Sequence, residues 1–196
     1  RVDEWLAEGI DVDRDGLYSE RSPNYAAHVT NPSLGAIGRA LGRPELKEQL
    51  DGIVYRNLET TLALVRPDDT VETVQSRRQD QATTRFPLAP YLAAYRTAAV
   101  ATGRADFAAA ARRAASSAPI DPELLAESLL RPELLAVMPG SEAASPSDAG
   151  HADAGTLGPS SYELETVGLV GRRSDAVETV LYGGSDYATH GRIRSG

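Results

Sequence analysis

The sequence of 196 residues has no cysteine, a single lysine and no long apolar run. Without cysteine, disulfide bonds, thiolate catalysis and cysteine-based zinc sites are all excluded. A helix that crosses a bilayer needs about 20 consecutive apolar residues, and no such run occurs. Acidic residues outnumber basic residues by 28 to 20, and the resulting net charge of −8 disfavours nucleic acid and an anionic membrane as partners.

What the chain does have is helical periodicity through most of its first 138 residues. The pattern predicts helices over 23–41, with a kink at Pro32 and Asn31 as a cap, and over 44–66, 87–102, 106–116 and 121–130. Segments 40–46 and 101–107 resemble each other, because in each a helix ends at Gly and the next begins after Arg. We therefore predict two helical hairpins that turn at Gly42 and Gly103. Such hairpins are typical of an αα-repeat array, either a solenoid or a closed toroid.

The composition changes after residue 139. Residues 140–160 are mostly Gly, Ser, Pro, Ala and Asp, which is typical of a linker. Beyond them the pattern has a period of two over 162–167, and 175–182 is rich in Val and Thr, with 171–175 expected as a turn. The predicted fold is thus mainly α and has three parts, namely an α-helical segment at 1–139, a flexible linker at 140–160 and a β-strand segment at 161–196.

An acidic loop near the start matches the first half of an EF-hand calcium loop, with Asp11, Asp13, Asp15 and Gly16 in the expected order. The twelfth position, where a bidentate Glu belongs, is Ser22. We therefore expect an acidic, solvated turn with Gly16 at a positive φ and no bound calcium. The chain contains no Gly-rich phosphate loop, zinc-binding His-Glu-x-x-His helix or nucleophile elbow, so we assign it no metal and no cofactor.

The segment 15–25 is the most informative for chemistry. It predicts a turn, an extended stretch and a helix whose first turn carries Tyr25, with His28 on the same face three residues later. A phenol beside an imidazole, with an arginine nearby to favour the phenolate, is a workable pair for proton transfer. The alternative is that Tyr25 is a packed aromatic and His28 a surface or core residue. Arg77 and Arg78 suit an anionic chain, because a guanidinium holds a carboxylate with two bonds, or else they lie in a solvated charged loop.

The pattern Asp-Gly-x-Tyr-x-Glu-Arg-Ser-Pro-x-Tyr at 15–25 resembles a segment in the helical domain of heparinase II/III-like polysaccharide lyases, alginate lyases included. The likeness continues through 66–70, which resembles the family's Pro-Asp-Gly turn with Asp69 in place of Gly, to the polar loop at 76–80. It implies an α/α toroid followed by the start of an antiparallel β-sandwich domain. It also implies an acidic, uronate-containing polysaccharide or oligosaccharide as substrate, and a periplasmic or secreted location.

In that family the Tyr at the position of Tyr25 is the catalytic acid and often also the base. The candidate catalytic residues are therefore Tyr25 and His28, and the candidate substrate-binding residues are Glu20, Arg21, Asn24, Arg77, Arg78, Gln79 and His190. The family's His directly after the Tyr is Ala26 here. Its upstream Asn and His groups would lie before Arg1, and its His of the β-domain would follow Gly196 unless it is His190, so we expect a partial chain whose site is completed from outside.

The expected reaction explains these residue types. A lyase removes the proton on C5 of a uronic acid and expels the oxygen on C4, which requires a neutralised carboxylate, a base and an acid. Two other functions fit the same sequence. One is a toroid glycoside hydrolase with Glu20 and Asp80 as its carboxylate pair. The other is a non-catalytic αα-repeat module that binds a glycan or a protein on its concave face. The oligomeric state stays unassigned.

Overall fold

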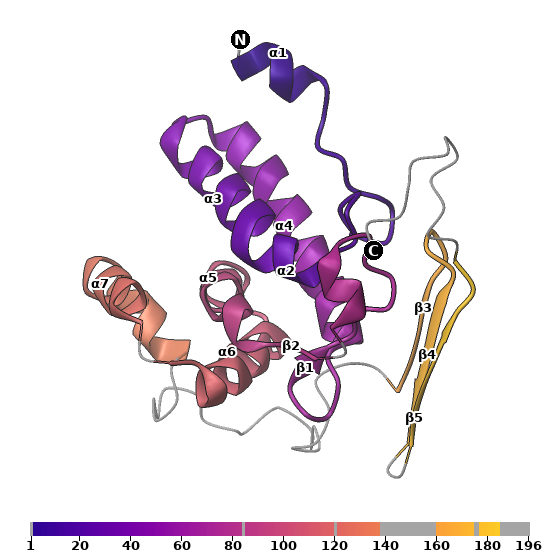
Figure 1. Cartoon of the computed structure of the whole chain (residues 1–196). Helices are drawn as coiled ribbons and strands as arrows, with labels where there is room; N and C mark the ends of the chain where they lie inside the picture. The colour runs from indigo at the N-terminus through magenta and orange to yellow at the C-terminus, as the bar shows by residue number, and fades with distance from the viewer. Residues whose placement is uncertain (1, 84, 120, 138–159, 175–176, 185–196) are drawn as a thin grey trace.

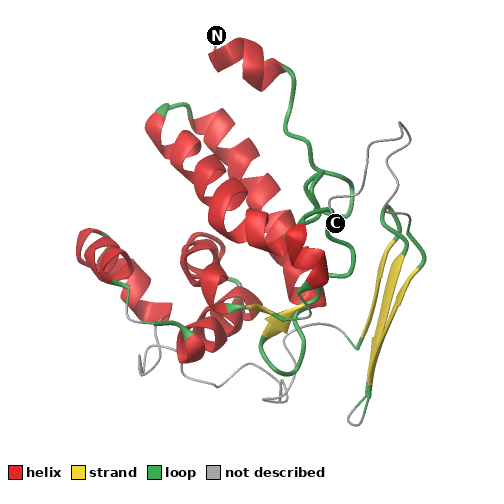
Figure 2. Ribbon diagram, in the orientation of Figure 1, coloured by secondary structure: helices red, strands yellow, loops and turns green. Residues whose placement is uncertain are grey.

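The computed structural model describes residues 2–83, 85–119, 121–137, 160–174 and 177–184 (Figure 1). It is mainly helical, as predicted, and has two small antiparallel sheets, of which the sheet near the C-terminus was predicted (Figure 2). Most of the predicted linker and the candidate His190 lie outside the described residues.

The chain begins with helices, has one short pair of strands between α4 and α5, continues with helices and ends with three strands. The helices are α1 (Val2–Ala7), α2 (Pro23–Tyr25), the π-helix η1 (Ala26–Thr30), α3 (Asn31–Ala40), α4 (Pro44–Leu64), α5 (Leu92–Thr102), α6 (Ala105–Ser117) and α7 (Pro122–Leu130). Short 3₁₀ turns are η2 (Gln79–Ala82), η3 (Ala89–Tyr91) and η4 (Pro132–Val137). The strands are β1 (Thr70–Val71), β2 (Phe86–Pro87), β3 (Ser161–Leu164), β4 (Leu169–Arg173) and β5 (Glu178–Tyr182).

Both predicted helical hairpins are confirmed. Figure 1 shows α3 folding back on α4 and α5 folding back on α6, and α4 contacts α5 so that the hairpins are neighbours. The turns lie at Gly42 and Gly103, whose φ angles of 59° and 68° fall in the left-handed region that favours glycine at the end of a helix. The likeness between segments 40–46 and 101–107 therefore reflects one turn used twice.

The helix predicted over 23–41 is interrupted by a π-helical turn. Pro32 has no N–H group, and its ring would clash with the carbonyl of His28 four residues earlier. The chain widens at this point, and the backbone N–H of Asn31 donates to the carbonyl of Ala26 five residues earlier. The predicted kink is thus a change of helix type.

Asn31 was expected as a helix cap, and this was wrong. Its side chain is buried, where it accepts a hydrogen bond from the Tyr18 hydroxyl (2.7 Å) and donates to the Asn57 side-chain oxygen (3.0 Å). Asn57 in turn donates to the carbonyl of Gly16 (3.0 Å). This chain of bonds leaves the buried amides satisfied and fixes the Asp-Gly turn to α3 and α4.

Two helices are shorter than predicted because extended pairing competes for their ends. Val65 is extended and pairs with Val71, so α4 ends at Leu64. Phe86 and Pro87 form β2 against β1, so the next α-helix begins only at Leu92.

The predicted antiparallel strands over 162–182 form, but the turn expected at 171–175 lies slightly later, between β4 and β5, where the backbone N–H of Ser174 donates to the carbonyl of Val177 (2.9 Å). A turn that was not predicted lies at Gly168, which has a φ of 67°, and β4 runs through Gly171. A Cβ atom on Gly171 would lie 2.1 Å from the ring of Tyr162 on the neighbouring strand. The glycine there serves a close cross-strand approach, not a turn.

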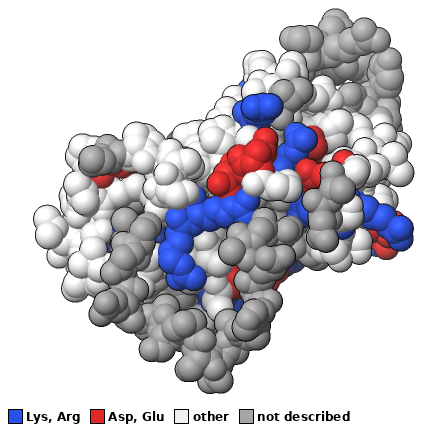
Figure 3. All heavy atoms as spheres, turned by 90° about the horizontal axis from the view of Figure 1, so that it is seen from below, with Lys and Arg blue, Asp and Glu red and all other residues white. Residues whose placement is uncertain are grey.

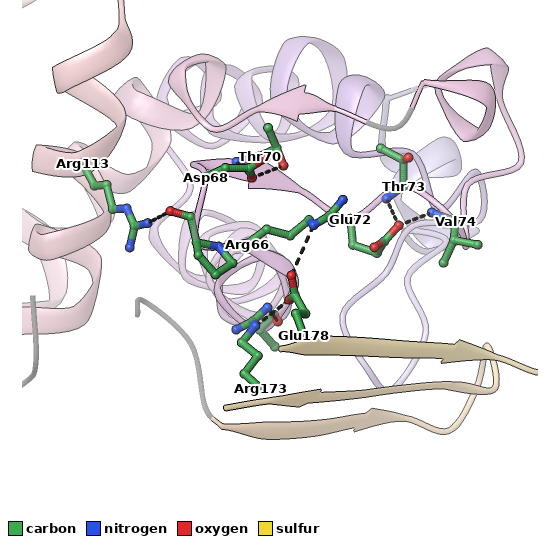
Figure 4. Close-up of polar contacts among 11 residues, drawn as sticks. Arg66, Asp68, Thr70, Glu72, Thr73, Val74, Arg113, Arg173 and Glu178 are labelled. Carbon is green, nitrogen blue, oxygen red and sulfur yellow. Dashed lines mark hydrogen bonds and ion pairs between the residues drawn. The ribbon is translucent and has the colours of Figure 1, made fainter. Parts of the chain in front are cut away.

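The three-stranded sheet is fixed to the C-terminal end of α4. Its inner apolar side chains belong to the same core as those of the helices. The Arg173 side chain, only 5% exposed, pairs with Glu178 (2.7 Å) and donates to the carbonyl of Ala63 (2.7 Å), while Glu178 also meets Arg66 (3.3 Å; Figure 4). Burial raises the pKa of Tyr162 to about 12.

On the underside of the molecule, basic side chains form a band beside acidic ones (Figure 3).

Asp69 adopts the conformation for which the resembling family uses glycine, with a φ of 61°. Aspartate tolerates this left-handed conformation better than most residues. Its carboxylate pairs with Arg113 of α6, labelled in Figure 4, which binds the turn to the second hairpin. Hydrogen bonds from Thr70 lower the pKa of the neighbouring Asp68.

Candidate functional site

The start of α2 and the loop 76–80 meet around one buried carboxylate, that of Asp80. Asp80 is only 8% exposed. One carboxylate oxygen accepts hydrogen bonds from the Ser22 hydroxyl (2.7 Å) and from the backbone N–H of Asn24 (3.2 Å), and the other accepts one from the Ser76 hydroxyl. The loop is strongly polar, yet Ser76 and Asp80 are buried because these bonds satisfy their polar groups.

The Ser-Pro pair of the sequence motif sets the position of Tyr25. The Ser22 hydroxyl accepts a hydrogen bond from the backbone N–H of Tyr25 (3.0 Å) and thereby caps α2, and Pro23 occupies its first position. The Tyr91 hydroxyl donates to the carbonyl of Pro23 (2.9 Å). The first turn is therefore held at both sides, with Tyr25 at its end.

The loop brings Arg78 onto Tyr25. The backbone N–H of Arg78 donates to the Ser76 hydroxyl (3.1 Å), and that of Arg77 donates to the carbonyl of Glu20 (2.9 Å). The Arg78 guanidinium lies over the Tyr25 ring, 4.3 Å from the ring centroid to its central carbon, and Nη2 donates to the phenolic oxygen. Two residues that the sequence singled out, 53 positions apart, thus meet in one place.

Tyr25 differs from the other tyrosines around it. Three of these are buried and each donates its hydroxyl proton to an internal acceptor: Tyr18 to Asn31, Tyr91 to Pro23 and Tyr95 to Leu58. Burial raises the pKa of all three phenols. Tyr25 is half-buried and accepts from Arg78, and within the described part of the chain its own proton has no acceptor. It is therefore suited to give that proton to a bound molecule.

His28 does not join Tyr25. It is exposed on the π-helix, and its ring meets that of Phe86 edge-on at a centroid separation of 6.3 Å. Among the described residues, no hydrogen bond or ring contact connects the two side chains. The predicted face-sharing assumed a regular α-helix, whereas the π turn changes the angular spacing directly after Tyr25.

Of the remaining candidates, Asn24 contacts the Asp80 carboxylate through its backbone N–H, and Glu20 and Arg77 are joined through their backbones. Glu20 and Asn24 are half-buried, and Arg77 and Gln79 are exposed. Arg21 has a φ of 52° and lines a cavity of about 10 Å³ beneath α2, which has room for one water molecule. Gln75 also lines this cavity, and among the described residues its buried side-chain oxygen has no hydrogen-bond partner.

The sequence predicted Asp80 only as one carboxylate of a hydrolase pair, whereas in the structure Asp80 joins the start of α2 to the loop. One carboxylate among six polar residues gives no periodic signal. The available signal was the serine cap at Ser22, which leaves its own hydroxyl proton in need of an acceptor.

The calcium-like loop holds the sheet. The Asp13 carboxylate accepts from the backbone N–H of Leu17 (2.9 Å) and contacts the Thr166 hydroxyl (2.7 Å) at the turn between β3 and β4. Asp15 accepts from the backbone N–H of Thr166 (2.8 Å), and Gly16 has the predicted positive φ, 85°. The turn is thus not simply solvated. Among the described residues, no group of three or more His, Asp or Glu side chains is placed to hold a metal ion.

We expect micromolar calcium to leave the melting temperature unchanged. The Asp13 and Asp15 carboxylates are engaged by Thr166, and Ser22 at the twelfth position is buried as the cap of α2. The measurement compares thermal unfolding in chelator, in calcium and in an equal concentration of magnesium. A rise that is specific to calcium would contradict the expectation.

Comparisons of the chain with protein-family models, with curated proteins and with solved structures find no match. No described helix is both long and apolar enough to cross a membrane. A functional assignment therefore depends on the residues of 15–25 and on the geometry around Tyr25.

Proposed function

We propose that the protein is a polysaccharide lyase that cleaves an acidic, uronate-containing glycan by β-elimination, with Tyr25 as its general acid and base. The observation that carries the proposal is the Arg78 guanidinium on a tyrosine whose proton has no acceptor in the described structure. The family resemblance of segment 15–25 supports the same reaction.

The proposed chemistry follows from this geometry. In the proposed step the Tyr25 phenolate takes the C5 proton, the electron pair of the C5–H bond forms the C4=C5 double bond, the bond from C4 to oxygen breaks, and the proton now on Tyr25 passes to the leaving oxygen. The negative charge left on the phenolic oxygen then faces the Arg78 guanidinium, which is already in place. Where the C5 proton and the leaving oxygen lie on one face of the sugar ring, the phenolate takes the next C5 proton and the cycle closes.

Charge near the site suits an anionic chain. Arg77 is exposed on the same loop as Arg78, with its Nη1 donating to the carbonyl of Ser19 (3.4 Å), so it adds positive charge at the surface beside Tyr25. Two adjacent guanidinium groups bind carboxylates or sulfates more specifically than lysines would, because each presents a planar pair of donors.

We further propose that the two hairpins belong to an α/α toroid and that the three strands begin a β-sandwich. The repeated glycine turn supports the first, and the regular alternation of buried and exposed residues along β3 and β4 supports the second.

The hydrolase alternative is less well supported. It needs two carboxylates across a cleft, with Glu20 and Asp80 as the candidates. Asp80 is buried and both of its oxygens accept hydrogen bonds from the protein, so it presents no free oxygen to a glycosidic bond or to a water molecule.

Incubation of the protein at its full length with a panel of polymers of different uronic acids, sulfated and unsulfated, tests the proposal. We expect new ultraviolet absorbance from an unsaturated uronate at the cleaved end. New reducing ends without that absorbance would instead establish a hydrolase. Binding without any cleavage would establish the non-catalytic module, and either result would overturn the lyase.

A further inference from the structure

We infer that Asp80 is the positioning residue that holds Arg78 against Tyr25. Asp80 would thus be a positioning residue of the proposed active site, and its effect on catalysis rests on the proposed function. Asp80 itself is buried and contacts neither the Tyr25 ring nor its hydroxyl among the described interactions, so it acts through its neighbours.

Two hydrogen-bond paths start at the Asp80 carboxylate: the helix arm leads through Ser22 to Tyr25, and the loop arm leads through Ser76 to Arg78. On one side the Ser22 hydroxyl donates to Asp80 and accepts from the backbone N–H of Tyr25 (2.7 and 3.0 Å). On the other, the Ser76 hydroxyl donates to Asp80 and accepts from the backbone N–H of Arg78 (3.1 Å). One carboxylate thus fixes the backbone of both residues that form the site.

A carboxylate suits this position because it only accepts hydrogen bonds. Each serine must point its proton at Asp80, so that its lone pairs face the backbone N–H of Tyr25 or Arg78. An amide in place of the carboxylate has one oxygen and one donating nitrogen. One serine would then have to accept where it now donates, and its own proton would lose its acceptor in a buried place.

The bond from the backbone N–H of Asn24 to Asp80 (3.2 Å) reinforces the helix arm. On the loop side, the bond from Arg77 to the carbonyl of Glu20 gives a second tie between the same two segments. We therefore expect that loss of the carboxylate shifts the loop relative to α2 without unfolding the hairpins, which carry their own core.

The first test uses a signal that does not depend on activity. With tyrosine labelled by ¹³C at the carbon that bears the hydroxyl, the Tyr25 resonance is assigned from its loss in Tyr25→Phe. In Arg78→Ala this resonance should move because the guanidinium is gone. In Asp80→Asn it should move in the same direction, while the Tyr95 resonance stays. Asp68→Asn is the matched control, since it makes the same change at a carboxylate that binds Thr70, and it should leave Tyr25 unmoved.

The second test is kinetic. Asp80→Asn should lower kcat about 10²-fold, as expected for a small misplacement of a catalytic group, with a much smaller change in KM. In the Arg78→Ala background the same substitution should have little further effect, because the group that it positions is already absent. An undiminished effect in that background would show a general structural role and overturn the inference.

Ser76→Ala covers the case in which Asp80→Asn does not fold. It removes only the loop arm and leaves the Ser22 cap of α2 intact. The Tyr25 resonance should move in this variant too, and an unmoved resonance in a folded variant overturns the inference. The two proposals fail separately. A moved resonance with no glycan cleaved would sink the lyase alone, and cleavage with an unmoved resonance would sink the role of Asp80 alone.

Discussion

Replacing Tyr25 with phenylalanine is expected to lower the turnover of an acidic glycan at least ~10²-fold, the range for loss of a general acid. The substitution keeps the ring and its contact with the Arg78 guanidinium but removes the proton that would reach the leaving oxygen. The free energy of unfolding should fall by at most about 1 kcal/mol, because Tyr25 is half-buried and its oxygen accepts a single bond. Initial rates and chemical denaturation of the same preparations give both quantities.

Tyr55→Phe is the matched control. It makes the same chemical change on α4, where the Tyr55 ring lies beside that of Phe107 with a centroid separation of 6.3 Å. We expect this variant to keep its full turnover. If Tyr25→Phe kept its turnover as well, and changed only the stability, Tyr25 would be a packed aromatic and the lyase assignment of this residue would end.

Local rules predicted the parts of the fold that local chemistry decides. Gly42 and Gly103 end helices because only a residue without a side chain enters the left-handed region at little cost, and this requirement is visible in the sequence. The start of the helix predicted over 121–130 is also decided locally, because Asp121 accepts a hydrogen bond from the backbone N–H of Glu123 and Pro122 suits the first turn.

The errors arose where a distant partner decides. Gly171 resembles a turn residue, yet the ring of Tyr162 across the sheet requires it to be glycine. Asparagine is a common helix cap, yet the side-chain amide of Asn31 is hydrogen-bonded to Tyr18 and Asn57 in the core. Neither partner is identifiable from the neighbouring sequence.

For the candidate site, too, the local features were predicted and the long-range contact was not. The start of α2 and the polar loop were both predicted from sequence, since Ser22, Pro23 and the arginines are local signals. Their contact was not, because it depends on the Asp80 carboxylate joining two segments that lie 58 positions apart. His28 shows the reverse error, in which an expected local neighbour of Tyr25 is turned toward Phe86 by a change of helix type.

The Asp-Gly turn that precedes the site is expected to be highly sensitive to a small substitution. Gly16 has a φ of 85°, and a Cβ atom there would lie 2.7 Å from the backbone oxygen of Arg56 and 2.8 Å from the Thr60 hydroxyl. The obstacle is mainly helix backbone, which cannot move aside as a flexible side chain could. Gly16→Ala should therefore lower the free energy of unfolding by about 2–4 kcal/mol, through backbone strain and overpacking together.

Gly9→Ala separates these two causes. Gly9 has the same φ of 85°, but nothing lies within 4 Å of a Cβ atom placed on it. Its substitution should cost only the conformational strain, about 1 kcal/mol. The difference between the two variants in urea denaturation measures how closely the turn lies on α4. Equal losses in both would show that Gly16 is needed only for its backbone conformation. A larger loss of stability at Gly16 would show that the turn packs closely against α4. If Gly16→Ala also lowers turnover at temperatures where the variant is still folded, the turn's contacts with Asn57 and Thr60 set the path of the chain into α2 and thereby the position of Tyr25.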